Sequence, residues 1–215
     1  MSIQIQVFTY GPFQENMYLL IDQQKNCVII DPGCYEQFEK EELLAFIQDN
    51  ELNPVALLNT HGHLDHVMGN AFIQRHYNLD YYLHELDIPT MEMSPRAAQM
   101  YGIPGFEPSP APNKLLKEGD KLIFGGIELE VFLTPGHAPG HVVFYNAENK
   151  FIINGDVLFR GSFGRYDLPG GDLPTLIRTI KEVMFQFPED TVVYTGHGPS
   201  TTIGIEKRSN PILNY

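Results

Sequence analysis

The sequence predicts an α/β (α+β) protein in which two mixed β-sheets pack as a sandwich with helices on the outside. Groups of short apolar strands alternate with a few helices, and the second half of the chain repeats the order of the first. No Gly/Ser-rich linker and no fixed-period repeat divides the 215 residues. A chain of this length can bury a sizeable core, so we expect one domain over residues 1–215.

The first half of the chain leads from strands into a loop rich in histidine. Strands are expected at 3–8, 17–22, 27–31, 55–59 and 80–83, and helices at 36–50 and 66–77. The apolar residues at helical spacing in the first helix are Phe38, Leu43, Leu44 and Ile47. The strand at 55–59 runs directly into the histidine-rich loop, so that loop should lie at a sheet edge.

The second half shows the same order of elements. Strands are expected at 121–124, 127–133, 141–146, 150–155 and 191–195, and a helix at 172–187 with Asp172 as its N-cap. The connecting stretch 94–113 contains five prolines, which predict that regular structure is absent there. This stretch is either a plain surface excursion or a loop beside the site that shapes substrate access.

Composition narrows the class of protein. The chain has 27 acidic and 14 basic residues, a formal charge of −13, and no basic stripe of the kind that neutralises nucleic-acid phosphates. Bound divalent cations would offset part of this charge. No apolar run is long enough to span a membrane, and no signal peptide is recognised. We therefore expect a cytoplasmic protein with no nucleic-acid or membrane partner.

A dense group of metal-ligand residues follows the strand at 55–59. His61, His63, Asp65 and His66 stand within six residues, and imidazole and carboxylate are ligands that zinc, iron and manganese favour. In a loop, His61 and His63 can converge on one cation while Asp65 and His66 turn toward a second. This pattern is hard to explain by packing alone, and it predicts metal binding.

Three later residues complete the predicted ligand set. His137 follows the strand at 127–133, Asp156 follows the strand at 150–155, and His197 follows the strand at 191–195. A carboxylate such as that of Asp156 has two oxygens and can bridge two metals. Other histidines are given structural interpretations: His141 opens a strand, and both His76 and His84 are expected at the surface.

These motifs resemble the metallo-β-lactamase superfamily over nearly the whole chain. The resemblance implies a four-layer αββα sandwich with the metals at one edge of the sheets. It assigns His61, His63 and His137 to the first metal; Asp65, His66 and His197 to the second; and Asp156 to both. Asp31 resembles the family's early aspartate, which supports the metal loop from behind. Its alternative role is in a turn or a helix cap.

Within that superfamily the segment from Gly155 to Asp172 resembles the glyoxalase II group, in its compact branch without the C-terminal helical domain. Arg165 stands where the group has a basic glutathione contact. It could instead pair with Asp167 or Asp172. Pro199 replaces a tyrosine of the glutathione grip, which weakens the expectation of glutathione as substrate.

The resemblance implies a metal-dependent hydrolase with two divalent ions, zinc first, with iron or manganese as alternatives. A metal-bridging hydroxide, positioned by Asp65 and Asp156 as catalytic residues, would cleave a small anionic thioester such as hydroxyacylglutathione. A thiolate leaves without obligatory protonation. The alternatives are an iron-dependent persulfide dioxygenase, a lactonase and a non-enzymatic metal-binding scaffold. The oligomeric state is not predicted.

Overall fold

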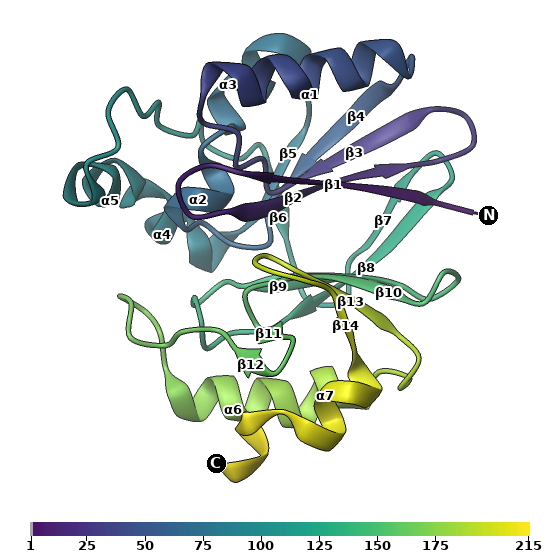
Figure 1. Cartoon of the computed structure of the whole chain (residues 1–215), viewed down its shortest axis with the longest axis vertical. Coiled ribbons are helices and arrows are strands. Elements are labelled where there is room, and N and C mark those ends of the chain that lie inside the picture. The colour runs from purple at the N-terminus through teal and green to yellow at the C-terminus, as the bar shows by residue number, and fades with distance from the viewer. Residues whose placement is uncertain (1) are drawn as a thin grey trace.

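The computed structural model describes residues 2–215, and Met1 lies outside the described part of the chain. Two six-stranded sheets face each other between outer helices, which gives the four layers of an αββα sandwich (Figure 1). Helices α1 and α3 cover the first sheet, and α6 and α7 cover the second. The αββα architecture predicted from the sequence is confirmed.

The first sheet contains, in spatial order, β1 (Gln4–Tyr10), β2 (Glu15–Ile21), β3 (Asn26–Ile30), β4 (Asn53–Leu58), β5 (Tyr81–His84) and β6 (Lys114–Leu116). The second contains β14 (Thr201–Thr202), β13 (Val192–Thr195), β10 (Phe151–Gly155), β9 (Val142–Asn146), β8 (Ile127–Leu133) and β7 (Lys121–Phe124). A two-stranded ribbon consists of β11 (Leu158–Phe159) and β12 (Ser162–Phe163).

The helices are α1 (Gln37–Asp49), α2 (Leu64–Val67), α3 (Asn70–Tyr77), α4 (Ile88–Glu92), α5 (Ser94–Tyr101), α6 (Leu173–Glu182) and α7 (Ile203–Ser209). Three 3₁₀ turns, η1 (Glu85–Asp87), η2 (Met184–Gln186) and η3 (Pro211–Asn214), complete the fold. In the described chain, no helix has both the length and the apolar character needed to cross a membrane.

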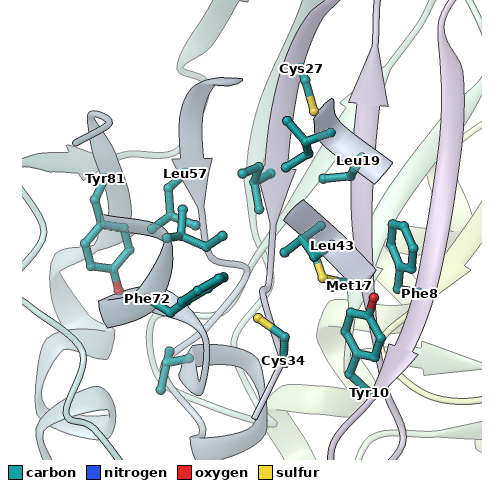
Figure 2. Packing of buried hydrophobic residues seen from close by; sticks show 14 of the residues in the cluster. Phe8, Tyr10, Met17, Leu19, Cys27, Cys34, Leu43, Leu57, Phe72 and Tyr81 are labelled. Carbon is teal, nitrogen blue, oxygen red and sulfur yellow. The ribbon is translucent and has the colours of Figure 1, made fainter. Parts of the chain in front are cut away.

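Alternation along β2 explains why this strand is buried on both faces. Successive side chains of a strand point to opposite sides. Leu19 therefore joins the core under α1 and α3, whereas Tyr18 and Leu20 join the core between the sheets. Figure 2 shows the outer core, where Leu43 of α1 and Phe72 of α3 pack with residues of the sheet. A third core lies between the second sheet and α6.

Strand direction brings the loops of interest to one edge. Strands β3, β4 and β5 run parallel, as do β10 and β13, so their carboxyl ends lie together within each sheet. The neighbouring strands β2 and β9 are antiparallel to them and begin at that same edge. The ends of β3, β4, β8, β10 and β13 and the starts of β2 and β9 thus form one rim.

Three predicted elements need correction. The proline-rich stretch contains α5, because Pro95 lies in the first turn of that helix, where a missing N–H costs nothing. Only its later part, 102–113, lacks helix and strand. The helix expected at 66–77 is divided between α2 and α3, because the N–H of Gly69 donates to the Pro32 carbonyl at 2.6 Å.

The helix expected at 172–187 ends at Glu182 and continues as the 3₁₀ turn η2. Its predicted start is confirmed: the Asp172 side chain accepts the N–H of Thr175 at 2.9 Å and caps α6. The short elements β6, β11, β12, β14, α4 and α7 were not predicted.

The core between the sheets makes a stability prediction. Phe144 is fully buried there, so Phe144→Ala should leave a cavity and lower the free energy of unfolding by about 3–5 kcal/mol. Ile123, which is 68% exposed on β7, provides the control, and Ile123→Ala should cost less than about 1 kcal/mol. Denaturant unfolding at fixed metal concentration measures both. Equal losses would contradict this account of the core.

Candidate metal centre

The predicted ligands occupy four loops that leave the rim. His61, His63, Asp65 and His66 follow β4; the other three, His137, Asp156 and His197, follow β8, β10 and β13. Because β4 belongs to the first sheet and the other strands to the second, the ligands can meet only where the two sheets meet. The structure brings all seven side chains together there.

Backbone hydrogen bonds tie the two sheets at this rim. The N–H of Val142 on β9 donates to the Thr60 carbonyl at 2.9 Å, and the N–H of Asn16 on β2 donates to the Gly196 carbonyl at 2.7 Å. Glu15 and His197 form an isolated antiparallel bridge beside the second of these. Backbone hydrogen bonds between the sheets therefore help to position the loops that carry the candidate ligands.

The first cluster consists of three imidazoles. Nε2 of His137 lies 3.2 Å from Nε2 of His61 and 2.8 Å from Nδ1 of His63. Nitrogens bound tetrahedrally to one zinc ion at its usual bond length stand about 3.3 Å apart, close to these separations. Burial and the neighbouring imidazoles lower the pKa of His61 well below its ordinary value and that of His63 to about 3. Both are then neutral, as metal ligands must be.

The second cluster joins two imidazoles to a carboxylate. Oδ2 of Asp65 lies 3.2 Å from Nε2 of His197 and 4.0 Å from Nε2 of His66. Burial acts to lower the pKa of His197, but hydrogen bonds with the Asp156 and Asp65 carboxylates outweigh it and raise that pKa to about 10. The proton on His197 therefore balances part of the negative charge of the carboxylates, and a bound cation would take over that role.

The carboxylate of Asp156 stands between the clusters. Its Oδ2 lies 3.5 Å from Nε2 of His137 in the first cluster and 3.5 Å from Nε2 of His197 in the second, while Oδ1 lies 3.5 Å from Nε2 of His66. A carboxylate that reaches donors of both clusters can be shared by two cations.

Two buried atoms support the fit of this donor set to metal ions. Nε2 of His66 and Oδ1 of Asp156 are buried and make no hydrogen bond within residues 2–215. Buried polar atoms normally have a partner. The two atoms lie 3.5 Å apart, and a cation bound by these residues would provide each with a partner. The buried His/Asp clusters have the composition of a binuclear metallo-β-lactamase site.

Asp31 supports the histidine-rich loop from behind. Its Oδ1 accepts the N–H of Thr60 at 2.8 Å and Nδ2 of Asn59 at 3.1 Å, and its Oδ2 accepts the Thr60 hydroxyl at 2.6 Å. Nδ1 of His66 lies 3.1 Å from the same Oδ2, and Nδ1 of His61 lies 3.0 Å from the Thr60 hydroxyl. One carboxylate therefore orients ligands of both clusters.

Glu15 is a residue that sequence reasoning missed. It opens β2, is 1% exposed, and neither of its carboxylate oxygens has a hydrogen-bond partner in the described chain. Its Oε1 lies 3.7 Å from Nδ1 of His66, and Glu15, Asp31 and His66 form a further group of donors. Burial raises the pKa of Glu15 well above its ordinary value. The only signal in the sequence was an acidic residue at the head of an apolar strand.

Two more supporting residues were also missed. Oδ1 of Asp87 accepts the N–H of Gly140 at 3.0 Å, and its Oδ2 accepts the N–H of Gly62, so this buried carboxylate joins the loop after β4 to the loop after β8. In the sequence, Asp87 is marked only by its position shortly after the strand expected at 80–83. His141, fully buried behind His61, accepts the N–H of Asp156 at 3.1 Å through Nε2. Its ring therefore fixes the backbone of the shared carboxylate.

The expected surface position of His84 is wrong. The side chain is 6% exposed, and its Nδ1 accepts the N–H of Leu86 at 3.2 Å at the start of η1. A local cap of this kind depends on the turn that follows β5, which the sequence did not reveal. His76 is exposed, as predicted.

Arg165 lies at the edge of the centre. Its guanidinium makes two hydrogen bonds with the Asp167 carboxylate, at 2.8 and 2.9 Å, so the ion pair considered from the sequence is present. Its carbonyl accepts Nδ1–H of His137 at 2.7 Å. The same residue lines the neighbouring cavity. Arg165 can therefore form the ion pair with Asp167 and also lie beside a substrate in the cavity.

A cavity of about 700 Å³ adjoins both clusters. Its floor includes His63, Asp65, His137, Asp156 and His197, and α5 forms part of its wall. Of the two interpretations of the proline-rich stretch, the structure favours the segment beside the site, because α5 borders the cavity.

Comparisons with known proteins agree with this geometry. Residues 10–197 match the family model of the Metallo-beta-lactamase superfamily. The chain belongs to that superfamily, and it is a metallo-hydrolase of this class.

Three relatives are close in length and sequence. The chain is 40% identical over 211 residues to the Hydroxyacylglutathione hydrolase GloC of Haemophilus influenzae, with 98% of each chain covered. The structure of TTHA1623, solved in a di-iron-bound form, is 43% identical, with a TM-score of 0.86 over 96% of this chain and 98% of the other. BLEG-1, a B3 metallo-beta-lactamase, is 34% identical, with a TM-score of 0.85 over 99% and 100%.

The pKa shifts predict that the two clusters respond differently to pH. A cation at the second cluster must displace protons, because His197 has a pKa of about 10 and that of His66 is also raised. In the first cluster, burial lowers the pKa of His61 well below its ordinary value and that of His63 to about 3, so a cation there displaces no proton from either ring near neutral pH. We expect affinity at the second cluster to fall about tenfold or more per pH unit between pH 8 and 6, with little change at the first. Chelator-competition titrations measure both affinities, and equal slopes would contradict the assignment.

Substitution of Asp31 tests the support of both clusters. Asp31→Asn keeps the shape and tolerates the left-handed backbone, φ 49°, but replaces one acceptor oxygen by an N–H donor. At the Oδ2 position that donor would oppose the Thr60 hydroxyl and Nδ1 of His66, and at the Oδ1 position it would oppose the Thr60 N–H and Nδ2 of Asn59. We expect metal affinity to fall about 10- to 100-fold, as for other groups that orient ligands. Asp22→Asn, in the turn between β2 and β3, is the control, and the idea fails if both variants bind metal like the parent chain.

Proposed function

We propose that this chain is a thioester hydrolase that cleaves a small anionic thioester, such as a hydroxyacylglutathione, with two divalent cations. The observation that carries the proposal is the Asp156 carboxylate, which reaches donors of two separate clusters at the floor of one cavity. The printed activity of the Haemophilus influenzae relative, a hydroxyacylglutathione hydrolase, supports the substrate class.

The proposed assignment follows the two clusters. His61, His63 and His137 would hold one cation, Asp65, His66 and His197 the other, and Asp156 both. Zinc suits this mixture of imidazole and carboxylate, and iron is the principal alternative because TTHA1623 was solved with two irons. Manganese is a third choice. Such a pair of cations supplies a Lewis acid for the carbonyl and a water that is acidic enough to attack at neutral pH.

The residues of the chain fix the ligands in the form that the chemistry needs. Nδ1 of His137 faces the Arg165 carbonyl at 2.7 Å, and Nδ1 of His197 faces the Phe13 carbonyl at 3.1 Å. A carbonyl only accepts, so each Nδ1 carries a proton, and each Nε2 is the atom left to bind a cation, in the case of His197 once its Nε2 proton has been displaced. Asp65 and Asp156 are the proposed catalytic residues, because their carboxylates border the position where the attacking water must lie.

A thioester fits the groups present around the cavity. A thiolate leaves without a proton, whereas an amide nitrogen needs a proton donor when it leaves. Arg165 is proposed to meet an anionic group of the thiol portion, such as a glutathione carboxylate. Its pairing with Asp167 holds the guanidinium at the cavity wall.

The test is a hydrolysis screen of purified protein with measured metal content against thioesters, lactones and β-lactams. We expect thioesters to be cleaved with the highest kcat/KM. Preferred cleavage of a lactone would favour a lactonase, and oxygen uptake with a glutathione persulfide, without thioester cleavage, would favour a dioxygenase. Tight metal binding without turnover of any substrate would favour a scaffold.

Removal of Asp65 provides a sharper test. Asp65→Ala takes away a direct member of the second cluster, so kcat for thioester hydrolysis should fall by more than about 100-fold, beyond the usual loss for a group that only orients a ligand. Asp190→Ala is a matched control, since that carboxylate is exposed and pairs with Lys150 on the surface. Full activity of the Asp65 variant would contradict the mechanism.

A further inference from the structure

We infer that the cavity selects thioesters with an apolar acyl chain of about four carbons or more, and that Arg96 binds an anionic group on the thiol portion. This inference rests on the proposed thioesterase function and specifies its substrate. A lactoyl group offers one methyl and one hydroxyl. The walls of the cavity are instead suited to a longer hydrocarbon chain.

The walls are mainly apolar and come from three separate segments. Phe13 lies in the turn between β1 and β2, Met93, Met100 and Tyr101 lie on or beside α5, and Phe159 lies on β11. Small-molecule sites are typically lined in this way, with a few polar groups that fix orientation. Phe163 of β12, Leu168 and Pro169 extend the same surface.

The apolar side chains of α5 are left open to solvent. Met93 is 42% exposed, Met100 76% and Tyr101 53%, yet all three line the cavity. Exposed apolar surface that is gathered in a concave site marks a binding surface. Methionine adapts to ligands of different shape, and an edge-to-face contact with Phe13 at 5.2 Å holds the ring of Tyr101 in place. An acyl chain would cover this surface.

The same cavity reaches the clusters without a barrier between them. Asp65, His137, Asp156 and His197 line it together with the apolar walls. A thioester carbonyl at the clusters therefore has its acyl chain and its thiol portion in the one cavity. The substrate must match both the apolar wall and the charged groups at its border.

Arg96 is a second cation at the border of this cavity. Arg165, which the proposed function assigns to an anionic group of the substrate, lines the cavity with its guanidinium paired to Asp167, and Arg96 lines it as well. No carboxylate of residues 2–215 forms an ion pair with Arg96, although the chain carries 27 acidic residues. An unpaired guanidinium beside an apolar surface is suited to the carboxylate of an amphipathic ligand.

The first experiment varies the acyl chain. The metal-loaded protein is assayed with S-lactoyl-, S-propanoyl-, S-butanoyl- and S-hexanoylglutathione. We expect kcat/KM to rise about threefold per added methylene from propanoyl to hexanoyl, since each buried methylene adds a near-constant transfer free energy. Met100→Gln should reduce this slope, and Ile123→Gln, on β7 and 68% exposed, should not. A flat series, or a preference for lactoyl, would overturn the inference.

The second experiment tests Arg96 with charged and uncharged thiols. Arg96→Gln should raise KM for S-hexanoylglutathione about tenfold and leave S-hexanoyl-N-acetylcysteamine unchanged, because only glutathione carries carboxylates. Arg178→Gln, on the exposed side of α6, is the control for a general loss of positive charge. Equal effects on both thioesters, or none on either, would overturn the role of Arg96.

Binding separates this inference from the proposed function. S-hexylglutathione and S-methylglutathione are thioethers that cannot be hydrolysed, and calorimetry gives their affinities for the same protein. Tighter binding of the hexyl compound, weakened by Arg96→Gln, supports the inference even if no thioester is cleaved, an outcome that would remove only the proposed activity. Cleavage of thioesters with equal affinity for both thioethers would overturn the inference alone.

Discussion

His66 is the point where the charges of the centre meet. This fully buried ring has four carboxylates within 4.0 Å: Glu15 and Asp31 face Nδ1 at 3.7 and 3.1 Å, and Asp156 and Asp65 face Nε2 at 3.5 and 4.0 Å. One imidazolium can balance only one of these charges. Buried carboxylates that lack a cation must take up protons or destabilise the fold. The rest of the centre depends on this excess of negative charge, which bound cations would offset.

The backbone around the four carboxylates and His66 is closely packed against these side chains. Gly196 packs against the Asp156 carboxylate and Cε1 of His66, where no Cβ could fit. Gly155 has φ +52°, and a Cβ there would lie 2.5 Å from the Thr60 hydroxyl. The charged groups are held near one another by backbone of this kind and by hydrogen bonds between the sheets. Their repulsion therefore cannot be relieved by small movements.

The sequence was informative where local chemistry decides the structure. The strand at 127–133 follows from apolar alternation, and α6 begins at Asp172 because its side chain caps the helix. The seven candidate ligands were predicted because each follows an apolar strand and is of a type that metals bind. Their convergence required the further condition that strands of two sheets end at one rim, which the family resemblance provided.

The residues that were missed share a different property. Glu15, Asp87 and His141 act through partners that are 15 to 53 residues away in the chain, and no local pattern marks such contacts. Helix α5 was missed for the opposite reason: prolines were counted as breakers, although Pro95 occupies the one turn of a helix that accepts it. Local sequence patterns indicate which chemistry a side chain can perform, whereas its long-range contacts depend on the fold.

The two clusters of candidate ligands and the wall of the cavity are built from different elements of the fold. The candidate ligands follow strands that pack into the cores of the two sheets, and hydrogen bonds between the sheets hold their loops. The cavity wall, in contrast, is formed by α5 and the ribbon of β11 and β12, which lie at the rim and carry exposed apolar side chains. If the proposed function holds, substitutions in that wall would alter the acyl group that is accepted without disturbing the carboxylates around His66. Arg96 and Met100 line the cavity outside the two clusters, so variants at these positions test substrate choice apart from the reaction.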